Sequence, residues 1–337
     1  MSAQSLAYVE LYVDDPVSVQ HYFVTAMGFT HVADSVTDRR TSALLRQGDV
    51  DLIVTSGPVT AQFLAQHGDG IADIALTCDD VQATSAAARA AGARVSVVDG
   101  QPVISDFGAV RHTLVPAGNI GRDPAHRVWT PQPGAPTRPG GHVRLLDHVA
   151  ICVAGGSLQA VADFYGAGLG LARFSSEYVD VGGQAMDSVV VRSATGEVTF
   201  TLVAPDVTRN PGQLDAFLER NDGPGVQHLA FLVDEILPAV AQFRERGVTF
   251  LSTPPTYYDM LGERFPEMAA EIGALREANV LADRDEWGYL LQLFSRSPYD
   301  RNTLFYELIQ RRGSRGFGSR NIRALYEAVE RDRLVTE

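Results

Sequence analysis

The chain has 337 residues, which is long enough for about two domains when one domain takes roughly 100–200 residues. Apolar residues make up 45% of it and charged residues 20%, which is the composition of an ordinary globular protein. The net charge of −13 disfavours nucleic acid and anionic membranes as partners, because both select proteins with a basic face.

Cysteine usage and hydropathy bear on the compartment. The two cysteines, Cys78 and Cys152, cannot form a disulfide framework, which indicates a reducing setting and predicts a cytoplasmic protein. Acidic residues begin at Glu10, and no apolar run approaches the roughly 18 residues of a membrane span. We therefore expect neither a signal peptide nor a transmembrane helix.

A run rich in proline and glycine, residues 116–143, divides the chain. Its six prolines and five glycines show no apolar periodicity, which predicts a surface linker rather than a helix or strand. We expect an N-terminal domain over residues 1–115 and a C-terminal domain over residues 144–337.

Each half of the chain carries the same pattern twice. Residues 8–57 and 147–205 each begin with an alternating β run, continue as an amphipathic helix and return through β-hairpins. Residues 68–95 match residues 223–250 as strand, helix, glycine and strand. The sequence thus predicts an α+β fold of four βαβββ modules, paired into two open-barrel domains that each curve around a cavity. The last module carries an insertion, residues 252–287, that could cover a cavity mouth.

Two histidines and a glutamate interrupt apolar strands at matching places in this repeat. His148 lies in the opening strand of the third module, and His228 lies in that of the fourth, 80 residues later. Glu307 follows after a further 79 residues, where strand alternation puts it on one face with Phe305 and Ile309. Two imidazoles and one carboxylate from separate strands are typical of the facial triad that holds non-haem Fe(II) and leaves positions open for substrate and O2.

Each of these three residues also has an interpretation without a metal. A histidine in a strand is often a hydrogen-bonded core residue, and Glu307 could pair with Arg311 or Arg312, since a buried carboxylate needs a partner. Three such residues on module-equivalent strands favour the metal site. The remaining histidines are predicted to be solvated: His21, His31, His67, His112, His126 and His142.

The first half has no equivalent ligand set. Tyr8 and Asp73 stand where the second half has its two histidines, and His112 is expected to hold the third position of this degenerate site. Tyrosine does not replace an imidazole ligand of Fe(II). The first half is therefore predicted to be a scaffold with a degenerate site.

The motifs around the triad resemble those of one enzyme family. They are LDHVAICV, GVQHLAF, PPTYYDML, EWGYLLQLF, RNTLFYELIQRRG and GFGSRNIRALYEAVE. Together they resemble the 4-hydroxyphenylpyruvate dioxygenase family of the vicinal-oxygen-chelate (glyoxalase-like) superfamily, over nearly the whole chain. The resemblance implies that His148, His228 and Glu307 are the Fe(II) ligands. It assigns these residues to the substrate pocket: Ser188, Thr201, Gln227, Gln292, Phe294, Phe317 and Ile322.

Two departures from the family pattern bear on the product. Homogentisate-forming dioxygenases carry phenylalanine where this chain has Ile322. They also carry Pro-Ile-Asn-Glu-Pro where this chain has residues 201–205, so that Thr201 replaces a proline and Val203 replaces an asparagine. Both changes resemble the 4-hydroxymandelate synthase branch of the family. This implies conversion of 4-hydroxyphenylpyruvate and O2 to 4-hydroxymandelate and CO2, within antibiotic (4-hydroxyphenylglycine) biosynthesis.

Two alternatives stay open. The chain could be a 4-hydroxyphenylpyruvate dioxygenase that forms homogentisate in tyrosine catabolism, or a non-catalytic small-molecule-binding protein of the same fold. The oligomeric state is also open, and a homo-oligomer is compatible with the sequence. An amphipathic helix that begins near Ile322 is expected to close over the metal cavity.

Overall fold

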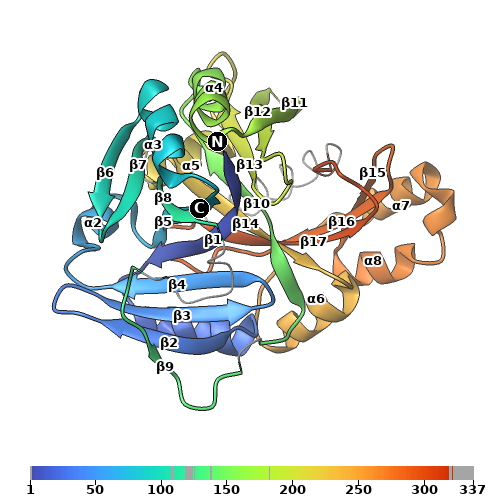
Figure 1. Cartoon of the computed structure of the whole chain (residues 1–337). Helices are drawn as coiled ribbons and strands as arrows, with labels where there is room; N and C mark the ends of the chain where they lie inside the picture. Colours follow the sequence, from blue (N-terminus) through green and yellow to red (C-terminus); the bar gives the residue numbers. More distant parts are fainter. Residues whose placement is uncertain are drawn as a thin grey trace.

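The structure, a computed structural model, describes residues 2–107, 110–117, 124, 126–136, 139–181, 183–318 and 321. Within these ranges the chain forms two large β-sheets, one from each half, with helices packed around them (Figure 1). No helix in the described ranges is long and apolar enough to cross a membrane.

The first sheet contains two of the repeated modules. Its strands are β1 (Ala3–Tyr12), β2 (Thr30–Val36), β3 (Thr41–Gln47), β4 (Val50–Ser56), β5 (Gly70–Cys78), β6 (Arg94–Val98), β7 (Gln101–Phe107), β8 (Val110–Pro116) and β9 (Thr130–Pro131). They lie in the order β6-β7-β8-β5-β1-β4-β3-β2-β9. The two opening strands, β1 and β5, pair antiparallel at the centre, and each is parallel to the last strand of its own module.

The second sheet repeats this arrangement. Its strands are β10 (Val143–Cys152), β11 (Ala172–Val181), β12 (Gln184–Arg192), β13 (Thr199–Pro205), β14 (Gly225–Val233), β15 (Leu281–Arg284), β16 (Tyr289–Phe294) and β17 (Phe305–Arg312). Their order is β11-β12-β13-β10-β14-β17-β16-β15, with β10 and β14 antiparallel at the centre. The predicted α+β fold of four βαβββ modules is confirmed.

One helix follows the opening strand of each module, and further helices join the modules. The helices are α1 (Pro16–His21) with the π-helix η1 (Tyr22–Ala26), α2 (Ala61–His67), α3 (Val81–Ala90), α4 (Leu158–Leu169), α5 (Gln213–Arg220), α6 (Ile236–Glu245), α7 (Pro255–Arg264), the 3-10 helix η2 (Pro266–Met268) and α8 (Ile272–Ala278). Local sequence sets their ends. The Asp80 carboxylate caps α3 by accepting from the Ala83 N–H at 2.9 Å, and α4 stops at Gly170, whose φ of 71° is left-handed.

Aromatic side chains join the two halves into one apolar core. Phe29 contacts Phe231 with ring centroids 5.9 Å apart, and Phe23 contacts Tyr306 at 5.5 Å. Edge-on aromatic pairs of this kind add to the free energy gained by burial. The first half therefore supports the sheet that carries the predicted metal ligands.

Part of the segment expected to be a surface linker packs against the first sheet. Strand β9 pairs with β2, and the buried guanidinium of Arg127 lies 2.6 Å from the buried carboxylate of Glu10. A proline-rich sequence does not reveal this contact, because it depends on a single arginine that reaches an acid in β1.

Two histidines predicted to be solvated are buried, so that prediction is wrong for them. His67 is 7% exposed and His112 is fully buried. His112 lies on β8, where its ring nitrogens contact the Ile74 carbonyl at 3.2 Å and the Tyr165 hydroxyl at 2.9 Å. Burial lowers the pKa of His112 to about 4, so the ring is neutral.

Candidate metal centre

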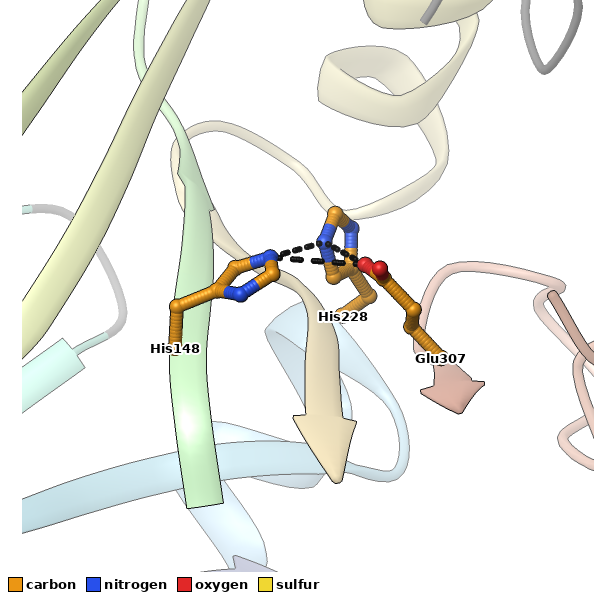
Figure 2. A group of neighbouring side chains, drawn as sticks. All are labelled: His148, His228 and Glu307. Carbon is orange, nitrogen blue, oxygen red and sulfur yellow. Dashed lines mark hydrogen bonds and ion pairs between the residues drawn. The ribbon is translucent and has the colours of Figure 1, made fainter. Parts of the chain in front are cut away.

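The three predicted metal ligands meet at one point, each from a different strand (Figure 2). Nε2 of His148 and Nε2 of His228 each lie 3.3 Å from Oε2 of Glu307, and 3.4 Å from each other. All three residues are buried. Within the described part of the chain they are the group of histidine, cysteine and acidic side chains able to share one ion, with ligand atoms within 4.8 Å of one another.

Strand register brings the three side chains together. His148 on β10 pairs with Ala230 on β14, and Ala230 pairs in turn with Glu307 on β17. His228 lies two residues before Ala230, on the same face of β14. Because Ala230 carries only a methyl group, the longer side chains on either side can meet above it.

A neighbouring residue orients each of the three side chains through the atom that points away from the meeting point. His148 Nδ1 lies 2.9 Å from the Asp147 carboxylate, His228 Nδ1 lies 3.2 Å from Oε1 of Gln227, and the Gln292 amide donates to Oε1 of Glu307 at 2.8 Å. Such outer contacts fix the ring tautomer and orientation at metal sites. Two imidazole nitrogens and one carboxylate oxygen remain to face one ion, which fits Fe(II) with open coordination positions.

Electrostatics in the site also favour a cation. Burial would raise the pKa of Glu307, but the neighbouring His148 holds it well below its ordinary value. Burial opposes the charged form of His148, yet Glu307 and Asp147 raise its pKa. The buried carboxylate is thus anionic and draws positive charge, which a metal ion supplies when it replaces the proton.

A cavity lined by apolar and polar side chains opens onto the triad. Its walls contain the three predicted ligands and these residues: Met186, Ser188, Thr201, Val203, Gln213, Leu214, Gln227, Gln292, Phe294, Phe305 and Phe317. The structure thus places six of the seven predicted substrate residues around it, and Ile322 lies outside the described residues. The resemblance did not assign Phe305 to the substrate pocket, although strand alternation places it on the face of β17 that carries Glu307.

Several polar side chains of the cavity already have protein partners. The Ser188 hydroxyl donates to the Glu177 carbonyl at 3.1 Å, and the Gln292 amide oxygen accepts from Asn321 at 2.9 Å. The Thr201 hydroxyl is buried and has no hydrogen-bond partner among the residues that the structure describes. Because buried polar groups are rarely left unpaired, this hydroxyl is free to meet a ligand.

The insertion over residues 252–287 contributes no residue to the described lining of the cavity. Its helix α7 instead contacts the segment that follows β17. The Tyr257 hydroxyl donates to the Asn321 side chain at 2.8 Å, and Asn321 is fully buried. The predicted C-terminal helix beyond Asn321 lies outside the described residues.

The arginines after Glu307 have other partners, so the alternative that pairs them with Glu307 is wrong. Arg311 contacts both carboxylate oxygens of Asp147 at 2.7 Å, and Arg312 pairs with Glu271 at 2.7 Å. Burial would raise the pKa of Asp147, but hydrogen bonds from Arg311 and His148 hold it well below its ordinary value. Sequence reasoning missed Asp147, whose only signal is its position directly before a predicted ligand.

Comparisons with known proteins agree with this geometry. The family model described as "Hydroxyphenylpyruvate dioxygenase, HPPD, N-terminal" matches residues 1–111, and the model of the "Glyoxalase/Bleomycin resistance protein/Dioxygenase superfamily" matches residues 145–293. The 4-hydroxyphenylpyruvate dioxygenase of Aspergillus fumigatus is 30% identical, over 97% of this chain and 92% of its own. That of Yarrowia lipolytica is 31% identical, over 96% and 91%. The solved structure of a mutant 4-hydroxymandelate synthase from Streptomyces coelicolor is 50% identical over 99% of this chain and 100% of its own, with a TM-score of 0.92.

Two curled sheets with a buried histidine–histidine–glutamate group define a metalloenzyme of the vicinal-oxygen-chelate fold. The chain belongs to the 4-hydroxyphenylpyruvate dioxygenase family, and it is a non-haem Fe(II) 2-oxo acid dioxygenase. The family and cofactor implied by the sequence motifs are confirmed.

Proposed function

We propose that the chain converts 4-hydroxyphenylpyruvate and O2 into 4-hydroxymandelate and CO2, with Fe(II) held by His148, His228 and Glu307. The observation that carries this proposal is the likeness to 4-hydroxymandelate synthase, at 50% identity against 30–31% for two 4-hydroxyphenylpyruvate dioxygenases. The reaction balances because the substrate carboxyl leaves as CO2. One oxygen atom of O2 enters the new carboxylate, and the other enters the benzylic hydroxyl.

The cavity suits a small aromatic 2-oxo acid. Bound Fe(II) supplies the positions that a chelating 2-oxo acid and O2 occupy, and the oxidising chemistry. Phe294, Phe305 and Phe317 supply apolar walls for the aromatic ring. The Thr201 hydroxyl, which has no partner among the described residues, supplies a hydrogen bond to a polar group. These groups bind and orient the substrate, and the buried position of the site excludes bulk water.

Placement of the ring decides which carbon is oxidised. Reaction requires atoms held near van der Waals contact, so a displacement of about an ångström can exchange a ring carbon for the benzylic carbon. Thr201 and Val203 lie on the cavity wall formed by β13, and we propose that these residues, together with Ile322, place the benzylic carbon nearest the metal. We further propose that catalysis belongs to residues 144–337, with residues 1–115 as scaffold, and that the product enters antibiotic biosynthesis.

A second candidate is the homogentisate-forming reaction, which the names of the relatives from Aspergillus fumigatus and Yarrowia lipolytica favour. The test for either enzyme is stoichiometry. Protein loaded with Fe(II) should consume one O2 and release one CO2 for each 4-hydroxyphenylpyruvate, and the anaerobic mixture should show a weak charge-transfer band. Binding of 4-hydroxyphenylpyruvate without release of CO2 would instead identify a non-catalytic binding protein.

A further inference from the structure

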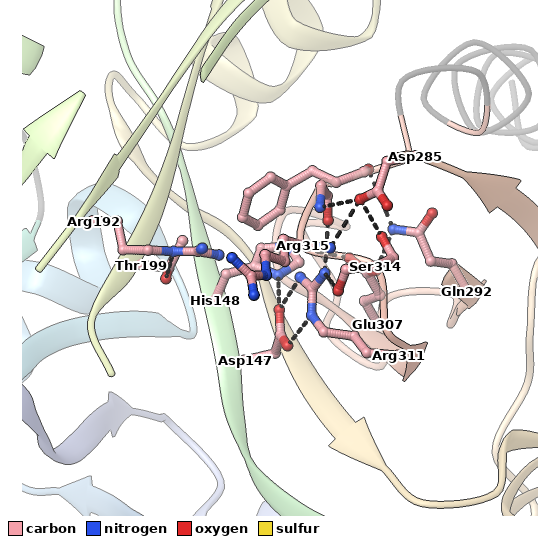
Figure 3. Close-up of polar contacts among 12 residues, drawn as sticks. Asp147, His148, Arg192, Thr199, Asp285, Gln292, Glu307, Arg311, Ser314 and Arg315 are labelled. Carbon is pink, nitrogen blue, oxygen red and sulfur yellow. Dashed lines mark hydrogen bonds and ion pairs between the residues drawn. The ribbon is translucent and has the colours of Figure 1, made fainter. Parts of the chain in front are cut away.

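The carboxylate of Asp147 lies between the predicted ligand His148 and the guanidinium of Arg311 (Figure 3). Oδ1 of Asp147 accepts from His148 Nδ1 at 2.9 Å and from Arg311 Nη2 at 2.7 Å, while Oδ2 accepts from Arg311 Nε at 2.7 Å. The side chains of Asp147 and Arg311 are 8% and 17% exposed. The orientation of the imidazole therefore depends on a carboxylate that the arginine holds at both oxygens.

The same guanidinium also holds the chain segment that follows β17. Nη1 of Arg311 donates to the Gly316 carbonyl at 2.7 Å and to the Ser314 carbonyl at 3.3 Å. The guanidinium carbon lies 5.3 Å from the centroid of the Phe317 ring. That ring lines the metal cavity and meets the His148 ring edge-on at 5.1 Å.

A second acid fixes the segment from its other side. Oδ2 of Asp285 accepts from the Ser314 hydroxyl at 2.7 Å and from the N–H groups of Arg315 and Gly316 at 2.8 Å each. The hydroxyl and N–H donors of the segment thus bond to Asp285, while the Ser314 and Gly316 carbonyls accept hydrogen bonds from Arg311. Residues 314–316 are therefore attached to the protein through Asp285 and Arg311 (Ser314 and Arg315 are labelled in Figure 3).

We propose that Arg311 is a positioning residue that couples the cavity wall at Phe317 to the orientation of His148, through Asp147. This inference rests on the proposed metal site. A guanidinium suits the role because its planar fork of five N–H donors can hold both oxygens of one carboxylate and a backbone carbonyl at once. A lysine ammonium carries the same charge but cannot make that set of contacts.

Coupling of this kind has a consequence that a purely structural ion pair lacks. If an ordered 314–318 segment helps to orient His148 for metal binding, then a bound metal must in turn order the segment, because coupling between two sites is reciprocal. An ion pair that only stabilises the fold predicts no effect of the metal on this segment.

The test uses Arg311→Lys, which preserves the charge near the metal and removes the fork. We expect the dissociation constant for Co(II), measured by titration of the metal-free protein, to rise about tenfold, as losses of such outer contacts usually do. The matched control is Arg312→Lys at the adjacent position, whose guanidinium pairs with the partly exposed Glu271. This control should bind Co(II) like the wild type.

Two further measurements separate coupling from general destabilisation. Co(II) should slow amide hydrogen exchange of residues 314–318 in the wild type and in Arg312→Lys, but much less in Arg311→Lys. Asp147→Asn should also raise the Co(II) dissociation constant, and Arg311→Lys should add little to it in the double variant, because Arg311 acts through Asp147.

The outcomes are distinguishable. A wild-type protein that binds no Co(II) overturns the metal site, and this inference with it. Unchanged affinity and unchanged exchange protection in Arg311→Lys overturn the inference alone, and leave the metal site intact. If Arg311→Lys does not fold, Asp147→Asn alone decides, because exchange protection by Co(II) that persists in that variant contradicts the coupling.

Discussion

Tyr8 holds in the first sheet the register position that His148 holds in the second. Tyr8 pairs with Ala75 and His148 pairs with Ala230, and in each case an irregularity in the pairing comes directly before the residue. Asp73 likewise holds the position of His228, since it pairs with Glu10 as His228 pairs with Ala150. The two halves thus share one framework and differ in the residues at its centre.

The residue of the first half that is equivalent to Glu307 is Thr113, not His112. Asp73 pairs with Arg111 as His228 pairs with Phe305, which puts Thr113 at the position of Glu307. The Thr113 N–H donates to Asp73 at 3.0 Å, and its hydroxyl donates to the other oxygen of the same carboxylate. The expectation for His112 failed because His112 is one residue out of phase on β8, and a shift of one residue reverses the face.

We predict one metal ion per chain, bound in the second half. Tyr8, Asp73 and Thr113 offer one carboxylate that is already hydrogen-bonded, and no imidazole, so they do not form an Fe(II) site. Metal analysis after anaerobic reconstitution should give one ion in the wild type and almost none in His228→Ala. Two ions per chain in the wild type would contradict the assignment.

Replacing Glu307 by Gln should abolish metal binding while the protein remains folded. The change removes the only carboxylate of the triad at nearly constant volume, and the shared apolar core does not depend on the ion. Loss of turnover should exceed the roughly 10–100-fold that follows loss of an outer contact. Far-UV circular dichroism checks the fold, and full activity in a folded variant would remove Glu307 from the ligand set.

Asp73 should make the fold less stable as the pH rises from about 4 to about 6. Burial raises the pKa of Asp73 to about 6, against the opposing charge of Arg111, whereas an unfolded aspartate has a pKa of about 3.9. The folded state therefore holds the proton more tightly, and stability is lost as the carboxyl ionises. Asp73→Asn has no carboxyl to ionise at this position. The difference in free energy of unfolding between this variant and the wild type should therefore move in favour of the variant by on the order of 2–3 kcal/mol between about pH 4 and about pH 6.

Urea unfolding at about pH 4.5 and about pH 7.5 measures this difference. Asp79→Asn is the matched control, because Asp79 is exposed just beyond the end of β5. If Asp73→Asn is destabilised equally at both pH values, the Asp73 carboxyl is ionised in the folded protein at both, which contradicts the raised pKa.

Replacing Ile322 by Phe should shift the product from 4-hydroxymandelate toward homogentisate or another ring-oxidised acid. An aromatic wall would press the substrate ring toward the metal, and a change of about 1.4 kcal/mol is enough to alter the product ratio tenfold. The ratio of the two acids is measured beside a thermal melt of each protein. An unchanged ratio with a lowered melting temperature would assign Ile322 to packing alone.

The sequence predicted the triad because each of its members interrupts an apolar strand. A buried polar or charged side chain in such a strand is costly unless it has a partner or binds a ligand. The contacts that orient the triad were not predictable in the same way. Asp147 reaches the ring of His148 next to it because the β10–β14 pairing is irregular between Leu146 and His148, so that Asp147 is left unpaired in a bulge. Alternation alone would place adjacent residues on opposite faces.

The fold was predictable from its fourfold repeat, because the strands and the helix of each module show their own periodicity of apolar residues in the local sequence. The burial of single polar residues was not predictable from the sequence. Arg127 lies in a proline-rich run that resembles a linker, yet its partner Glu10 is more than a hundred residues away in sequence. Contacts of this kind depend on how distant segments meet, which periodicity does not encode.

The identity of the acid formed in a single aerobic turnover separates the two possible reactions most directly. Protein loaded with Fe(II) is mixed with 4-hydroxyphenylpyruvate in air, and the product is separated by chromatography against both authentic acids. We predict 4-hydroxymandelate as the main product, formed in equal amount with CO2. Homogentisate as the main product would contradict the proposed function, and would make the chain a 4-hydroxyphenylpyruvate dioxygenase with an unusual pocket.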